Sequence, residues 1–247
     1  MEKKTIALAG NPNVGKSTVF NALTGMKQHT GNWPGKTVTN TVGHAKYKDT
    51  VFEFVDLPGA YSLNSKSPDE AVTGSYILSG KADLVLIVAD ATCLKRNLLL
   101  IKDILAVTGK AVLCVNLMDE AEKKGICPDI AKLQELLGIP VIATAARSKK
   151  GLPQLLETLY SFCPQDASPM QKSEIDIDDV YRQCVTLKNS QPHGFDRRLD
   201  RIVTSKVLGF PIMILLLLVI FWITMVGANY PSSALSSLFD MLDEKLR

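Results

Sequence analysis

Short apolar runs alternate with amphipathic stretches through the first two thirds of the chain. Five of these runs are typical of strands bounded by turn residues, at 5–10, 51–58, 83–90, 111–116 and 140–145. Several of the stretches between them have helical spacing of apolar positions. This alternation predicts an α/β fold with a mostly parallel sheet flanked by helices, filling residues 1–165.

The pattern changes after about Pro164, where a polar and acidic segment is followed by helix-like sequence to Lys206. We interpret 166–206 as a linker and a small helical subdomain. Residues 207–228 then carry no charge, and about 20 apolar residues suffice to cross a membrane. We expect a transmembrane helix there rather than a buried core helix, with Pro211 in its first turn.

Basic residues stand on one side of this span. Arg197, Arg198, Arg201 and Lys206 precede it, whereas 229–243 contains no Lys or Arg. Because such residues favour the cytoplasmic side, the N-terminal part is expected in the cytoplasm. Residues 229–247 are expected to form a short extracytoplasmic amphipathic segment.

Composition narrows the picture further. The chain has 247 residues, 46% hydrophobic and 21% charged, which suits one domain with an appendage. A net charge of +3 gives no support to a nucleic-acid partner. The cysteines form no CxxC pair, so zinc and redox chemistry are not indicated and a reducing compartment is the simpler interpretation; they are Cys93, Cys114, Cys127, Cys163 and Cys184.

A glycine-rich loop follows the first predicted strand and precedes helical sequence. It is a complete Walker A sequence, in which backbone N–H groups gather on phosphate oxygens at a helix N-terminus. Lys16 is expected to reach the β- and γ-phosphates, and Ser17 to supply a hydroxyl to Mg²⁺. The nucleotide-binding residues predicted here are Gly10, Asn11, Pro12, Asn13, Val14, Gly15, Lys16, Ser17 and Thr18.

A short acidic motif, Asp56-Leu57-Pro58-Gly59, closes the second strand. Asp56 is suited to hold Mg²⁺ through a water molecule, and the N–H of Gly59 to meet the γ-phosphate. The alternative is a plain turn, and the position of the motif after a strand favours the functional interpretation.

Guanine recognition is indicated by Asn116-Leu117-Met118-Asp119, at the end of the fourth strand. The Asp119 carboxylate can accept the two N–H groups of the guanine edge, and Asn116 would brace the loop. Thr144, Ala145 and Ala146 follow the fifth strand, in the position of a loop whose backbone contacts the base oxygen.

The order of these motifs resembles that of translation-factor-like G proteins, and further segments narrow the resemblance. They are 31–38 (GNWPGKTV), 67–70 (SPDE), 116–126 (NLMDEAEKKGI), and 196–202 leading into 208–212. On these residues nearly the whole chain resembles the N-terminal part of the bacterial ferrous-iron transport protein B family. The resemblance implies a GTP-binding and GTP-hydrolysing cytoplasmic domain that couples nucleotide state to Fe²⁺ uptake at the bacterial inner membrane.

The resemblance also implies roles for the loop at 31–38. Thr37, preceded by Gly35 and Lys36, matches the switch threonine that meets Mg²⁺ and the γ-phosphate; otherwise it is a surface threonine. Asn13 matches the asparagine that holds K⁺, together with the carbonyls of Gly31 and Trp33; otherwise Asn13 stabilises a turn and Trp33 packs.

Ala60 stands where Ras-like proteins have a water-positioning glutamine, so slow, K⁺-stimulated hydrolysis is expected, with catalytic roles for Asn13, Lys16, Thr37 and Gly59. The cofactors would be GTP or GDP, Mg²⁺ and K⁺.

The family's helical subdomain relays switch state to the pore, and its members continue beyond a single span. The expected partners are therefore membrane lipid, the remaining transporter helices or further copies of the chain, and a small cytoplasmic accessory protein. Two alternatives are a membrane-tethered regulatory GTPase without transport and a ribosome- or RNA-associated GTPase. His29 and His44 are expected on the surface of the switch loop and the following strand, and His193 in a loop.

Overall fold

The computed structural model describes residues 2–25, 28–32, 39–63, 68–162, 175–187, 205 and 209–227. The chain divides into two compact units, Met1–Ser190 and Gln191–Arg247.

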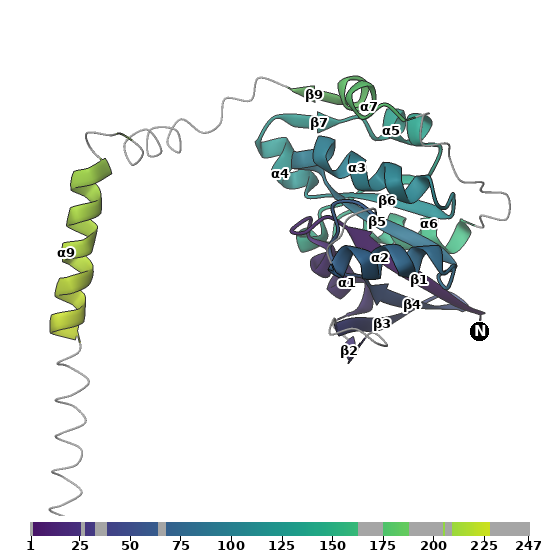
Figure 1. Ribbon diagram of the computed structural model, residues 1–247, viewed down its shortest axis with the longest axis horizontal. Helices are drawn as coiled ribbons and strands as arrows, with labels where there is room; N and C mark the ends of the chain where they lie inside the picture. The colour runs from purple at the N-terminus through teal and green to yellow at the C-terminus, as the bar shows by residue number, and fades with distance from the viewer. Residues whose placement is uncertain are drawn as a thin grey trace, which may run out of the picture. The chain divides into compact units, whose positions relative to one another are not determined.

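Seven strands of the described residues form the central sheet of the first unit, in the order β2-β3-β4-β1-β5-β6-β8 (Figure 1). Five of them are parallel and coincide with the five apolar runs, so the predicted α/β sheet is confirmed. They are β1 (Glu2–Gly10), β4 (Thr50–Asp56), β5 (Leu84–Asp90), β6 (Ala111–Asn116) and β8 (Val141–Ala143).

Two further strands extend this sheet in the antiparallel sense. β3 (Thr39–Tyr47) pairs with β4, and β2 (Gln28–Asn32) pairs with β3. The placement of His29 in a loop was wrong, because residue 29 lies on β2 and pairs with Val42 of β3. His44 is an exposed residue of β3, as expected, and its Nε2 lies 3.1 Å from an oxygen of Glu53.

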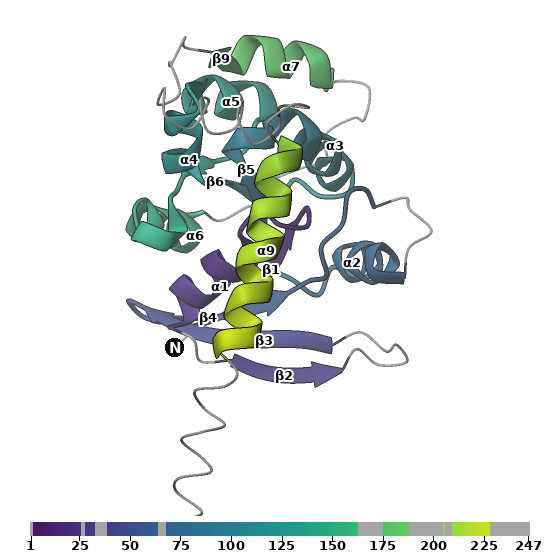
Figure 2. The ribbon, with the colours of Figure 1, turned by 90° about the vertical axis from the view of Figure 1, so that its left-hand side faces the viewer.

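Helices cover both faces of the sheet, which explains why the parallel strands are apolar without alternation (Figure 2). α1 (Lys16–Thr24) and α6 (Leu152–Ser161) contribute to one buried cluster. α2 (Pro68–Leu78), α3 (Leu94–Leu105) and α5 (Ile130–Leu137) contribute to the other.

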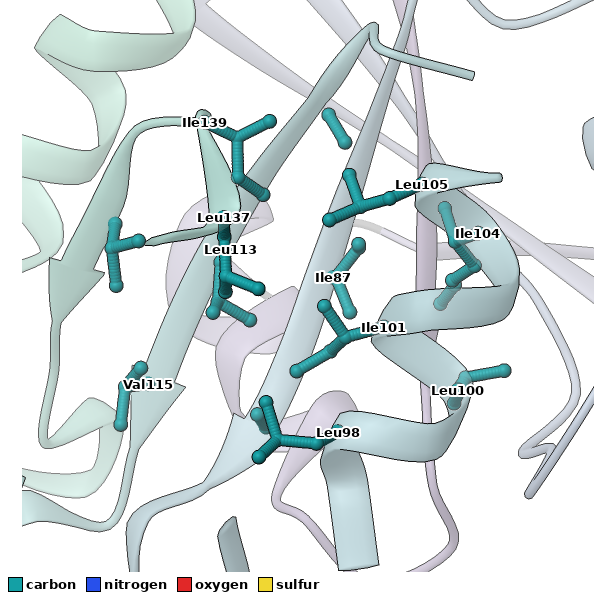
Figure 3. Packing of buried hydrophobic residues seen from close by; sticks show 14 of the residues in the cluster. Ile87, Leu98, Leu100, Ile101, Ile104, Leu105, Leu113, Val115, Leu137 and Ile139 are labelled. Atoms are coloured by element: carbon teal, nitrogen blue, oxygen red, sulfur yellow. The ribbon is translucent and has the colours of Figure 1, made fainter. Parts of the chain in front are cut away.

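Strand side chains divide between these clusters with period two. On β5, Leu86 belongs to the α1 side and Ile87 to the α3 side. Figure 3 shows Ile87 facing Leu98 and Ile101 of α3. Each such side chain, fully withdrawn from water, stabilises the fold by about 1.5–3 kcal/mol.

Short elements complete the first unit. The 3₁₀ turns η1 (Ala91–Cys93) and η2 (Ala146–Ser148) and the helix α4 (Met118–Lys123) follow the carboxyl ends of the strands. β7 (Ile126–Pro128) pairs with β9 (Val185–Leu187) in a separate two-stranded sheet, and α7 (Ile177–Cys184) packs on α3 and α5.

The acidic segment predicted as a linker contains the start of α7. The carboxylate of Asp176 accepts hydrogen bonds from the backbone N–H groups of Asp178 and Asp179, and it therefore caps the helix.

The second unit contains α9 (Gly209–Gly227), whose described side chains are largely exposed and apolar. Within the described residues, no helix is long and apolar enough to cross a membrane, so the transmembrane helix expected at 207–228 is not shown. Both ends of α9 lie within that expected span.

Candidate nucleotide-binding site

The glycine-rich loop lies between the carboxyl end of β1 and the first turn of α1. A Cβ atom on Gly10 would lie 2.5 Å from the carbonyl oxygen of Val88. Only glycine at this position therefore allows β1 and β5 to lie this close together. Asn13 and Gly15 have φ of 66° and 81°. Left-handed residues in a loop that opens a helix produce the concave array of N–H groups that binds phosphates.

Two cavities lie at this loop and at the helix that follows it. One, of about 580 Å³, is lined by Asn11, Pro12, Asn13, Gly15, Lys16, Ser17, Thr18 and Gly59. The other, of about 490 Å³, is lined by Thr18, Asn21, Ala22, Gly25, Ala146, Arg147 and Lys149. Thr18 borders both. The first therefore suits the phosphates, and the second, beside the loop at 144–146, suits the ribose and base.

Most residues of the second cavity are not part of any sequence motif. Thr18, Asn21, Ala22 and Gly25 recur at the spacing of one helix face, a signal that was present in the sequence. Arg147 and Lys149 gave no such signal, because only the packing of η2 beside α1 brings them there.

Lys16 and Asp56 form an ion pair in the floor of the site. β1 and β4 are adjacent parallel strands, so the loop after β1 and the carboxylate ending β4 meet at one edge of the sheet. The two side chains are only 11% and 17% exposed, and each charge depends on a partner. Ser17, the next residue, is exposed and lines the phosphate-side cavity.

Backbone hydrogen bonds attach the DLPG motif to β1 and the glycine-rich loop. The N–H of Leu57 donates to the carbonyl of Leu8 at 3.0 Å, and that of Ala60 to the carbonyl of Gly10 at 3.1 Å. A Cβ atom on Gly59 would lie 3.2 Å from Pro12, so little space separates the two motifs.

Asn116 joins three loops of the site. Its Nδ2 donates to the carbonyl of Val14 at 3.1 Å, and its Oδ1 accepts from the Thr144 hydroxyl at 3.2 Å and the Ala146 N–H at 3.0 Å. The Met118 N–H donates to the Thr144 carbonyl at 3.2 Å. Asn116 therefore joins its own loop to the glycine-rich loop and to the loop at 144–146. Leu117 and the half-buried Asp119 flank the brace, and Ala145 is buried beside it.

Cys114 is buried beside the hydrogen bonds of Asn116. Burial raises the pKa of this thiol to about 12, so it stays neutral at physiological pH. Its Sγ lies 3.1 Å from the Thr144 hydroxyl.

Among the described residues that line the two cavities, Asn11 has buried side-chain atoms without a hydrogen-bond partner. Its side chain is 1% exposed, and neither amide atom has a hydrogen-bond partner among the described residues. Buried amides are normally paired with protein, water or ligand.

Several predicted site residues lie outside the described residues: Trp33, Gly35, Lys36 and Thr37. Gly31 lies on β2, where its backbone pairs with Asn40. The assignments of Mg²⁺ to Thr37 and of K⁺ to Asn13, Gly31 and Trp33 stay predictions. Within the described part of the chain, no group of three or more His, Cys, Asp or Glu side chains could hold a metal ion.

A Walker A loop between β1 and α1, an acidic residue ending the adjacent strand and a guanine-type motif braced against that loop define a P-loop G protein. Comparison with known proteins agrees, since residues 4–159 match the N-terminal family described as Ferrous iron transport protein B. The chain belongs to this family.

Three similar proteins illustrate the relationship. The Fe(2+) transporter FeoB of Campylobacter jejuni is 31% identical over 99% of this chain and 42% of its own length. The Fe(2+) transport protein A/Fe(2+) transporter FeoB fusion protein of Porphyromonas gingivalis is 41% identical over 63% of this chain and 19% of its own length. The cytosolic domain of T. maritima FeoB in GMPPNP form is 36% identical with a TM-score of 0.65, covering 83% of this chain and 75% of that one. This chain thus spans less than half the length of the Campylobacter jejuni and Porphyromonas gingivalis proteins.

Proposed function

We propose that this chain binds and hydrolyses GTP as the cytoplasmic G domain of a membrane Fe²⁺ transporter and couples nucleotide state to Fe²⁺ uptake. The observation that carries the proposal is the Asn116 brace, which holds the phosphate loop and the guanine loops in one site. The relatives named as Fe(2+) transporters, and the one crystallised in GMPPNP form, support it.

Mg²⁺ fits the donor set at the phosphate end. Ser17 offers a hydroxyl and Asp56 a carboxylate, the oxygen ligands that Mg²⁺ prefers, and Thr37 would add a second hydroxyl. Asp56 is held by the cationic side chain of Lys16 in this structure, which indicates a position suited to a positive partner. When bound, Mg²⁺ would neutralise the β- and γ-phosphate oxygens.

The chain's own residues supply positioning and charge. Lys16 would turn from Asp56 to the β- and γ-phosphates, and the Gly59 N–H would meet the γ-phosphate. Ala60 cannot orient water, so turnover is slow without additional positive charge. Asn13, which lines the phosphate-side cavity, would hold K⁺ with the carbonyls of Gly31 and Trp33 and so accelerate hydrolysis.

The test is GTP hydrolysis by the full chain in KCl and in NaCl. We expect faster turnover in K⁺, loss of that difference in Asn13→Ala, and loss of nucleotide binding in Lys16→Ala. Lys132→Ala, which breaks an exposed ion pair within α5, serves as a matched control. Equal rates in the two salts would remove the K⁺ site, and hydrolysis unaffected by Lys16→Ala would overturn the GTPase assignment.

The cellular setting is part of the same proposal. The chain would reside at the bacterial inner membrane with its G domain on the cytoplasmic side and its α9 region at the lipid. The Porphyromonas gingivalis fusion supports a small accessory protein as partner, and the greater length of the relatives supports further transporter segments. Iron uptake by cells complemented with the full transporter, carrying Lys16→Ala in this region, would test the coupling.

A further inference from the structure

Helix α2 lies against the segment that follows β4. A Cβ atom on Gly74 of α2 would lie 3.2 Å from the carbonyl oxygen of Leu63. Ile77, one turn further along α2, is buried in the same apolar cluster as Leu57 and Ala60. These contacts hold the helix beside the DLPG motif.

Two polar side chains of α2 form hydrogen bonds with the backbone of this segment. The hydroxyl of Thr73 donates to the carbonyl of Pro58 at 2.8 Å. The carboxylate of Glu70 accepts from the N–H of Tyr61 at 2.7 Å. Thr73 is 0% exposed and Glu70 is 7% exposed, so both hydrogen bonds start from buried side chains. One helix therefore holds both ends of the segment Pro58–Tyr61.

The hydrogen bond of Thr73 is not the one that a helical threonine makes by default. A threonine within a helix can donate to the carbonyl four residues earlier. Thr24 of α1 and Thr158 of α6 both do so, at 2.9 Å. Thr73 instead donates to a carbonyl 15 residues earlier, in a different segment. Local helix geometry does not account for this choice, so the bond is a tertiary contact specific to the DLPG motif.

The carbonyl of Pro58 belongs to the same peptide unit as the N–H of Gly59. A trans peptide unit is planar, and its carbonyl and N–H point in opposite directions. A hydrogen bond that fixes the carbonyl therefore also fixes the direction of the N–H. It also polarises that N–H, because linked hydrogen bonds strengthen one another. Gly59 lines the phosphate-side cavity, so Thr73 acts on a peptide unit at the edge of the nucleotide site.

We propose that Thr73 is a positioning residue for the γ-phosphate of GTP. Its hydroxyl holds the Pro58–Gly59 peptide in one orientation before the nucleotide arrives, so less conformational freedom is lost when the Gly59 N–H meets the γ-phosphate. GDP lacks this phosphate, and its affinity does not depend on Thr73. The inference rests on the proposed GTP binding and extends it, because a side chain outside the nucleotide motifs contributes to the preference between GTP and GDP.

The test compares Thr73→Val with Thr73→Ser in the full chain. Val keeps the branched shape and removes the hydroxyl, whereas Ser keeps the hydroxyl. We would measure the dissociation constants of GMPPNP and GDP in the presence of Mg²⁺. In Thr73→Val we expect GMPPNP to bind about 3- to 10-fold more weakly, as for the loss of one hydrogen bond, and GDP to stay within about 2-fold of the parent. In Thr73→Ser the ratio of the two constants is expected to equal that of the parent.

Thr24→Val is the matched control. Thr24 is also buried and also donates one hydroxyl hydrogen bond, but to Phe20 within α1. This variant is expected to be less stable without a change in the ratio of the two constants. Urea denaturation of every variant separates a general loss of stability from a changed nucleotide preference. If Thr73→Val does not fold, Thr73→Ala, which removes the hydroxyl together with the methyl group, takes its place in the comparison.

Three results decide the matter. Selective weakening of GMPPNP, with recovery in Thr73→Ser, would support the positioning role. An unchanged ratio of the two constants in the folded variant without the hydroxyl, whether both affinities fall equally or neither falls, would overturn that role and leave the proposed function intact. Failure of the parent chain to bind either nucleotide would overturn both.

Discussion

The side-chain amide of Asn116 holds the glycine-rich loop and the loop at 144–146 to its own loop. Replacing it with Ala leaves the carbonyl of Val14, the N–H of Ala146 and the hydroxyl of Thr144 without this buried partner. We expect Asn116→Ala to lower the free energy of unfolding by about 3 kcal/mol, measured by urea denaturation, because buried unpaired groups cost about 1–3 kcal/mol each. Thr144→Ala removes one of these hydrogen bonds and should cost about 1 kcal/mol. Equal costs for the two variants would contradict the bracing role.

Single residues of the site were predictable where a motif determines their chemistry. The Walker lysine, Asp56 and Asn116 were identified from their positions after strands, and the structure brings all three to one edge of the sheet. Arg147 and Lys149 were not identified, because their place at the second cavity depends on how η2 packs against α1. The Lys16–Asp56 ion pair was not anticipated either, since it depends on the pairing of β1 with β4, which the two motifs do not record.

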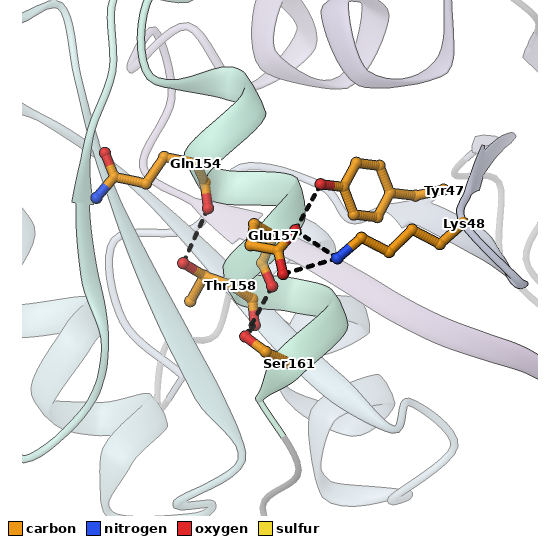
Figure 4. A network of polar contacts seen from close by, with 6 residues as sticks. All are labelled: Tyr47, Lys48, Gln154, Glu157, Thr158 and Ser161. Carbon is orange, nitrogen blue, oxygen red and sulfur yellow. Dashed lines mark hydrogen bonds and ion pairs between the residues drawn. The ribbon is translucent and has the colours of Figure 1, made fainter.

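The β3–β4 hairpin is attached to α6 through one carboxylate (Figure 4). Glu157 accepts hydrogen bonds from Lys48 Nζ at 2.8 and 2.9 Å and from the Tyr47 hydroxyl at 2.6 Å. The Tyr47 and Tyr160 rings lie edge to face at 5.9 Å, and Lys48 Nζ lies 4.6 Å from the centre of the Tyr160 ring. Charged and aromatic contacts at the surface thus join the turn of the hairpin to α6.

This network makes stability depend on pH in the acidic range. The hydrogen bond from Lys48, and then that from Tyr47, lower the pKa of Glu157. A lowered pKa in the folded state means that the contribution is complete above the unfolded value of about 4.3 and is lost as the pH falls through the folded value. We expect Glu157→Gln to be less stable than the parent at pH 7 and to approach it below pH ~4, measured by urea denaturation at several pH values. Glu135→Gln serves as a surface control, and a difference that does not vary with pH would contradict the assignment.

The strands that are buried on both faces are the ones that the sequence predicted. The five parallel strands are buried on both faces and therefore appear in the sequence as continuous apolar runs. β2 and β3 extend the sheet with sequences rich in polar residues, and β7 and β9 have three residues each, too few to display a period. Their pairing is fixed by tertiary contacts that no local pattern records.

The whole molecule raises the question of where its folding unit ends. The change in sequence pattern predicted that the G domain ends near residue 165. The compact first unit instead continues to Ser190 and includes α7 and β9. Among the described residues beyond 165, three are buried in the cluster under α3: Ile175, Val180 and Cys184. They belong to the same hydrophobic core as the sheet. We therefore expect the cooperatively folding unit to end after β9.

Two truncations separate these boundaries. We expect residues 1–190 to unfold cooperatively and to bind nucleotide with the affinity of the full chain, because the strands, both buried clusters and α7 are all present. Residues 1–165 should be less stable by about 3–6 kcal/mol, since the buried side chains of α7 and Ile175 are removed and the apolar side of α3 meets water. The difference in the free energy of unfolding is measured by urea denaturation monitored by circular dichroism. Equal stability of the two fragments would show that α7 contributes nothing to the stability of the G domain.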